Sequence, residues 1–123
     1  MKVARINQLD GVKFTGGVSY RPVVAKHGLG FSVHKTVIPK GGPHRWCYQN
    51  HLEACYCIKG KGILTDLSTG ITHYITPDTV YMLDNHDNHT FEALEDTVLI
   101  SVFNPPVTGL ETHDKNGSYS LSK

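Results

Sequence analysis

The sequence predicts a single all-β domain, a sandwich or a barrel, and three observations carry this prediction. Twelve glycines and six prolines divide the 123 residues into short segments. These segments are rich in Val, Ile, Thr, Tyr and Phe, the residues enriched in strands. No segment keeps a 3.6-residue hydrophobic period for the length of a substantial helix. We therefore expect residues 1–123 to form one domain around one core.

Strands are expected wherever a β-branched or aromatic run lies between turn residues. In order, these runs are residues 18–25, 31–38, 53–59, 62–66, 73–75, 79–83, 90–93 and 97–103. The intervening stretches 27–30, 39–43, 59–62, 68–70 and 84–87 contain Gly, Pro, Asn, Asp or Ser, the residues of tight turns.

Two of these strands place a polar side chain on an otherwise apolar face. Alternate side chains of a strand point to opposite faces, so Glu53 shares its face with Cys55 and Cys57. By the same parity Ser101 shares its face with Leu99 and Phe103. A small barrel with a polar-lined cavity is typical of this pattern, although a strand buried on both sides with a tolerated serine would look alike.

The charge balance limits the partners. Twelve Lys and Arg against eleven Asp and Glu provide no basic surface for nucleic acid or for anionic lipid. No apolar run approaches a membrane span of roughly 20 residues, and the first residues lack a signal-peptide core. We expect a cytoplasmic protein with a small-molecule substrate, no nucleic-acid or membrane partner, and three reduced cysteines rather than disulfides.

Glu53, Gly60 and His89 match parts of the two loose sequence motifs of the cupin jelly roll. Glu53 followed by Gly60 keeps the acid-to-glycine spacing of the first motif, and His89 fits the histidine of the second. The histidine pair that normally precedes the acid is missing. A metal would need another ligand, and Tyr81, eight residues before His89, is available. Carboxylate, phenolate and imidazole donors suit iron, manganese or zinc.

Four blocks of the chain, residues 28–36, 48–60, 81–89 and 103–119, resemble ectoine synthase. The resemblance extends over about residues 21–119 and implies a single-domain cupin, a jelly-roll β-barrel. It also implies a hydro-lyase that closes N-γ-acetyl-L-2,4-diaminobutyrate to ectoine, a cyclic compatible solute used in osmoadaptation, with loss of water. A homodimer and an Fe2+ cofactor, with Zn2+ or Mn2+ as alternatives, are implied as well.

The resemblance also implies roles for individual residues. The implied metal ligands are Glu53, Tyr81 and His89. Residues implied in catalysis or in support of the site are Tyr48, His51, Ser101, Glu111 and His113. Residues implied in substrate binding are Arg21, His34, Thr36, Leu83, Asp87, Phe103 and Glu111.

Two positions depart from the family pattern. Gly17 stands where the family has tryptophan, and Ser101 stands where it has cysteine. The first change removes a large apolar wall, and the second replaces a soft, ionisable thiol by a hydroxyl. Two alternatives follow: a pocket redirected to another N-acyl diamino acid, amide or amidine, and a cupin that binds a solute without turnover.

Overall fold

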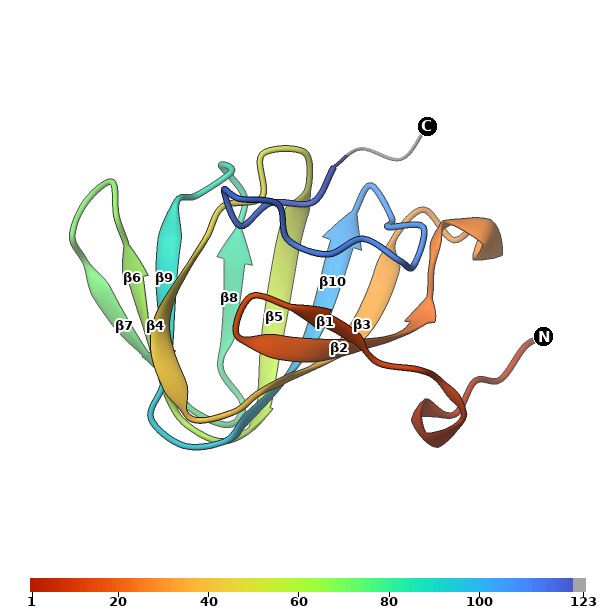
Figure 1. Cartoon of the computed structure of the whole chain (residues 1–123), viewed down its shortest axis with the longest axis horizontal. Coiled ribbons are helices and arrows are strands. Elements are labelled where there is room, and N and C mark those ends of the chain that lie inside the picture. The colour runs from red at the N-terminus through yellow and green to blue at the C-terminus, as the bar shows by residue number, and fades with distance from the viewer. Residues whose placement is uncertain (121–123) are drawn as a thin grey trace.

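Ten strands form two antiparallel sheets within residues 1–120, the part of the chain described by the computed structural model (Figure 1). The six-stranded sheet has the order β1 (Val12–Phe14), β2 (Gly17–Val23), β3 (Ser32–Ile38), β10 (Thr97–Asn104), β5 (Leu52–Lys59) and β8 (Val80–Leu83). The four-stranded sheet has the order β4 (Gly41–Trp46), β9 (His89–Ala93), β6 (Gly62–Asp66) and β7 (Thr72–Ile75). Two short 3-10 turns, η1 (Ile6–Gln8) and η2 (Ala25–His27), complete the elements. No helix in residues 1–120 is long and apolar enough to cross a membrane.

The predicted all-β architecture is confirmed, and the eight predicted strands are present with ends shifted by at most two residues. Strands β1 and β4 were not predicted. The prediction of a turn over residues 39–43 is wrong from Gly41 onward, because β4 begins there. This strand lies at the edge of its sheet, and its pairing with β9 is irregular between Gly41 and His44. An edge strand with such an irregularity tolerates Pro43, which cannot donate a backbone hydrogen bond.

The inner face of the six-stranded sheet carries the polar residues that parity predicts. On β5, Glu53, Cys55 and Cys57 are buried, whereas Tyr56 and Ile58 on the other face are 42% and 46% exposed. Strand β3 likewise buries every second residue, and three of these four are polar. The interior therefore has polar groups on one wall, and the outer face of β5 is open to solvent.

Strand register aligns these inward side chains in two neighbouring rows across β3, β10, β5 and β8. One row contains Ser32, Phe103, Glu53 and Leu83. The next row contains His34, Ser101, Cys55 and Tyr81. Residues far apart in the sequence thus become neighbours because directly opposite side chains in antiparallel strands lie close together.

The segment after β10 crosses the end of the two sheets (Figure 1). The Ala25 amide donates to the Val107 carbonyl at 2.8 Å, and the Cys47 amide donates to the Gly117 carbonyl at 3.0 Å. Only glycine fits at position 117, because a Cβ there would lie 2.5 Å from the Arg45 carbonyl oxygen. This close approach carries Tyr119 into the interior, where it is 2% exposed.

Candidate active site

The three predicted metal ligands come from both sheets and are all buried. Glu53 lies on β5 and Tyr81 on the neighbouring β8, whereas His89 begins β9 of the opposite sheet. The residues Glu53 and Tyr81 occupy adjacent inward rows, and His89 pairs in register with Asp66 on β6. The fold therefore places two ligand candidates on one wall and the third on the other.

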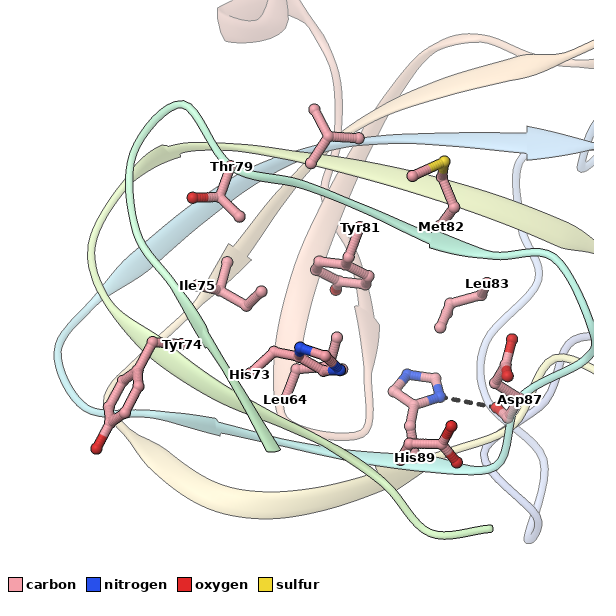
Figure 2. A pocket seen from close by; sticks show the side chains of 12 residues that line it. Leu64, His73, Tyr74, Ile75, Thr79, Tyr81, Met82, Leu83, Asp87 and His89 are labelled. Carbon is pink, nitrogen blue, oxygen red and sulfur yellow. Dashed lines mark hydrogen bonds between the residues drawn. The ribbon is translucent and has the colours of Figure 1, made fainter. Parts of the chain in front are cut away.

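Tyr81 lines two separate cavities. A cavity of about 340 Å3 opens between β6 and β7 on one side and β8 on the other (Figure 2). Tyr81, Leu83, Asp87 and His89 line it, so it contains four of the predicted site residues. An inner space of about 10 Å3 is lined by Glu53 and by the predicted residues Thr36, Tyr48, Tyr81, Ser101 and Phe103. Tyr81 borders both spaces, which connects the Glu53 side of the site with the His89 side.

His89 borders the larger cavity, and one of its two ring nitrogens has no hydrogen-bond partner within residues 1–120. Its Nδ1 donates to the Asp87 backbone carbonyl at 2.9 Å, as Figure 2 shows. Its Nε2 is buried and has no hydrogen-bond partner within residues 1–120. Burial lowers the pKa of His89, so the ring is neutral and Nε2 carries a lone pair. A histidine fixed through Nδ1 with Nε2 unpartnered is the arrangement found in metal-binding histidines.

Glu53 is a buried carboxyl group that forms no ion pair with a positively charged side chain within residues 1–120. Burial raises its pKa to about 8, and hydrogen bonds with Cys55 and Ser101 oppose this rise. Removing a carboxylate from water is costly unless a cation or hydrogen bonds compensate it. Within residues 1–120 no group of three or more His, Cys, Asp or Glu side chains could hold a metal ion. A metal at this position would therefore need the Tyr81 phenol beside Glu53 and His89.

Tyr48 and His113 form a second polar pair in the interior. Their side chains lie 2.7 Å apart, from the Tyr48 hydroxyl to Nε2 of His113. Burial, with a smaller effect of Arg21, lowers the pKa of His113 to about 3, and burial raises the pKa of Tyr48. A neutral imidazole and a protonated phenol share one hydrogen bond here, and the tautomer of His113 determines which of the two donates.

Arg21 lies between β2 and the C-terminal segment. Its Nε donates to the Ser19 hydroxyl at 2.8 Å and its Nη2 to the Tyr119 hydroxyl at 3.3 Å. Its guanidinium carbon is 5.2 Å from the centre of the Tyr119 ring, and Nη1 is 3.9 Å from the Glu111 carboxylate. Glu111 in turn accepts the backbone amides of Thr108, Gly109 and Leu110. The predicted residues Arg21 and Glu111 are thus brought together, although neither borders the two cavities.

Two further predicted residues, His34 and His51, pack against Phe103. The His34 ring stacks on Phe103 with ring centres 4.8 Å apart, and the His51 ring meets it edge-on at 5.9 Å. Burial, with a smaller effect of Arg21, lowers the pKa of His34 to about 3. Both histidines support the aromatic side chain that lines the inner space.

At Gly17 and Ser101, the two positions that depart from the family pattern, neighbouring side chains fill the space or form hydrogen bonds. A Cβ at Gly17 would lie 2.6 Å from the Val37 carbonyl and 2.8 Å from the Phe14 ring, so Phe14 fills the adjoining space. The Phe14 ring packs edge-on against Trp46, with ring centres 5.6 Å apart. The Ser101 hydroxyl lies 2.9 Å from the Thr36 hydroxyl and 3.6 Å from the Cys55 sulfur.

Six side chains that line the inner space were not among the predicted site residues, namely Phe14, Ile38, Trp46, Cys55, Leu99 and Tyr119. Phe14 lies on the short strand β1, which was not predicted. Tyr119 belongs to the block 103–119 that resembles the family. Its neighbours in the sequence are polar, so the sequence does not predict that its side chain is buried. Cys55 has the parity of Glu53, which was the available signal.

The two antiparallel sheets, with polar side chains in the inward rows of the larger one, are the architecture of a cupin jelly roll. An RmlC-like cupin from Shewanella frigidimarina shares the fold with a TM-score of 0.69 at 16% identity, covering 85% of this chain and 91% of its own. The sequence model described as ectoine synthase matches residues 1–123. The crystal structure of ectoine synthase from P. lautus superposes with a TM-score of 0.83 at 37% identity, over 89% of this chain and 81% of that chain.

Relatives at higher identity agree with this match. An L-ectoine synthase from Desulfosudis oleivorans is 50% identical over 107 residues, covering 86% of this chain and 83% of its own. An L-ectoine synthase from Halalkalibacterium halodurans is 43% identical over 125 residues, covering 98% and 97%. The chain belongs to the ectoine synthase family and is a lyase of that type.

The low pKa of His34 predicts a loss of stability in acid. The unfolded chain takes up a proton at His34 near its ordinary pKa of 6.5, whereas the folded chain does not until about pH 3. The free energy of unfolding should therefore fall as pH drops from 6.5 toward 4, by up to about 1.4 kcal/mol per pH unit from this group. Urea denaturation at several pH values should show a shallower slope for His34→Gln. His73→Gln, on β7, is the control, and equal slopes for His34→Gln and the wild type would contradict the assignment.

Proposed function

We propose that this protein closes N-γ-acetyl-L-2,4-diaminobutyrate to ectoine with loss of water. The proposal is supported by the family and by the printed names of its relatives. The single structural observation that carries it is that Tyr81 and His89 line one cavity of about 340 Å3, and that Nε2 of His89 is buried without a hydrogen-bond partner within residues 1–120. Cavities of this size hold small-molecule ligands.

The reaction determines what the site must supply. An amine attacks an amide carbonyl, which is a poor electrophile, and the carbonyl oxygen leaves as water. The ammonium must lose a proton before attack, and the departing oxygen must gain protons. The linear substrate must also be held folded, so that its two ends meet in a space that excludes bulk water.

We assign Glu53, Tyr81 and His89 to bind Fe2+, with Zn2+ or Mn2+ as alternatives. The donors fit such an ion because Glu53 is a buried carboxyl group, Tyr81 is a buried phenol, and Nε2 of His89 is unpartnered. Oxygen and imidazole donors suit these metals. When bound, the ion would supply the Lewis acidity that an amide carbonyl requires.

The remaining predicted residues receive roles that match their surroundings. From the resemblance to the family we assign Arg21 to the substrate carboxylate, which a guanidinium binds through paired hydrogen bonds, although Arg21 borders neither of the two cavities. Leu83 and Asp87 contact the substrate from the larger cavity, and Thr36 and Phe103 from the inner space. Tyr48 shares a hydrogen bond with His113, so we assign the pair to proton transfer beside the inner space. His34 and His51 support Phe103, Glu111 orients Arg21, and Ser101 contacts Thr36 and Cys55.

The test combines turnover with ligand removal. Protein loaded with Fe(II) and given N-γ-acetyl-L-2,4-diaminobutyrate should form ectoine, detected by chromatography. Glu53→Gln, Tyr81→Phe and His89→Gln should each weaken Fe(II) binding at least about tenfold and lose turnover, because each removes one donor. Tyr56→Phe, on the outer face of β5, is the control and should behave as wild type.

Two results would contradict these assignments. Equal iron binding by the wild type and all three ligand variants would show that the ligands are wrong. Folded, iron-loaded protein that makes no ectoine would show that the reaction is wrong, and turnover of another N-acyl diamino acid would then replace the substrate. Binding of ectoine without conversion in either direction would instead support a solute-binding role.

We also infer a homodimer in the cytoplasm. The outer face of β5 and β8 exposes five large apolar side chains, with exposures from 40% to 65%: Leu52, Tyr56, Ile58, Val80 and Met82. Strand β8 is an edge of its sheet, and natural proteins cover or protect such edges. Twofold dimers are the commonest oligomers. The three unpaired, buried cysteines suit a reducing compartment.

Charges on this face should separate the dimer. Ile58→Glu with Met82→Glu places two carboxylates on the apolar face, where burial against a second copy would be costly. Light scattering after size-exclusion chromatography should give the mass of a dimer for the wild type and of a monomer for the double variant. Ile71→Glu, at a 55% exposed position outside this face, is the control and should stay dimeric. A double variant that keeps the dimer mass would place the interface elsewhere.

A further inference from the structure

Cys55 is the cysteine that lines the inner space. It is 1% exposed on β5, and the inner space is also bordered by Glu53, Tyr81 and Ser101. The next inward residue of the same strand, Cys57, is equally buried but does not border the space. The two thiols share strand, parity and burial, and they differ in what they contact.

A chain of polar contacts leads to Cys55 from two strands away. The hydroxyls of Thr36 on β3 and Ser101 on β10 lie 2.9 Å apart. The Cys55 sulfur on β5 is 3.6 Å from the Ser101 oxygen, within hydrogen-bonding range for sulfur. Strand register makes Ser101 and Cys55 direct partners, so this contact is set by the backbone.

The chain continues from Cys55 to two of the proposed metal ligands. Cys55 lies directly opposite Tyr81 in the register of β5 and β8, and it lies two residues from Glu53 on the same inward face of β5. All three side chains line the inner space. A thiol has one hydrogen to donate and an accepting sulfur, so Cys55 carries both functions that a carboxylate and a phenol beside it can use. Cys57, in contrast, donates to the Lys59 carbonyl of its own strand at 3.5 Å.

We propose that Cys55 is a positioning residue, which holds the Glu53 carboxylate and the Tyr81 phenol at the spacing that metal binding requires. The Thr36, Ser101 and Cys55 contacts fix the thiol from the side opposite to Tyr81. Side chains that orient metal ligands change metal affinity and activity without touching the metal. The inference rests on the proposed metal site and adds a residue to it that the ligands alone do not include.

Anaerobic Fe(II) titration of single variants tests this inference. Cys55→Ala removes the thiol beside Glu53 and should weaken Fe(II) binding about tenfold or more. Cys55→Ser keeps a donor and acceptor at the same position and should recover most of that affinity. Cys57→Ala removes an equally buried thiol from the same strand and should bind iron as tightly as the wild type. Circular dichroism and the thermal unfolding midpoint show that each variant is folded.

A separate variant keeps the test decisive if Cys55→Ala does not fold. Ser101→Ala interrupts the chain on β10 without altering β5, and it should also weaken Fe(II) binding. Folded Cys55→Ala that binds iron like the wild type would overturn the inference. So would Cys57→Ala losing as much affinity as Cys55→Ala, or Cys55→Ser recovering none.

The outcome is separable from that of the proposed reaction. If the wild-type protein binds iron but makes no ectoine, only the proposed reaction is contradicted. The Fe(II) titrations would still test the role of Cys55. Wild-type protein that binds no iron would overturn the inference together with the metal site.

Discussion

Glu53 in the interior is the constraint on which the site depends. A carboxyl group at this depth has its pKa raised to about 8, and it stays charged only with compensation. Hydrogen bonds from Cys55 and Ser101 supply part of that compensation. A divalent cation would supply the rest. Tyr81 borders the inner space together with Glu53, and it also borders the larger cavity together with His89. Strands β10 and β8, which flank β5, carry Ser101 and Tyr81.

The segment that follows β10 contributes Tyr119 to the lining of the inner space. Tyr119 enters the inner space and packs under Arg21, whose guanidinium reaches Glu111 of the same segment. Phe14 and Trp46 complete the aromatic lining beside it. Little free volume is left around Glu53, whereas the cavity between β7 and β8 stays open to Tyr81 and His89. The structure thus leaves little free volume beside the acid and an open cavity on the other side of Tyr81.

Much of this was predictable from the sequence, and the failures have physical causes. Period-2 patterns found the long strands, and parity placed Glu53 and Ser101 on inner faces. Strand β1 was missed because it is only three residues long, and β4 was missed because two glycines and Pro43 fill its first half. Only the pairing partners, β2 and β9, identify these edges as strands. Tyr119 and Phe14 were missed because their burial comes from tertiary contacts with Arg21 and Trp46. The cross-strand contact between Cys55 and Ser101 depends on register, which local composition does not encode.

We propose that Glu53, Tyr81 and His89 bind one iron ion. Crystals grown with Fe(II), and measured at the iron absorption edge, would locate this ion in an anomalous difference map. We expect one peak, at bonding distance from the Glu53 carboxylate, the Tyr81 hydroxyl oxygen and Nε2 of His89. A peak at other residues, or a fully loaded crystal in which Nε2 of His89 has no metal neighbour, would contradict it.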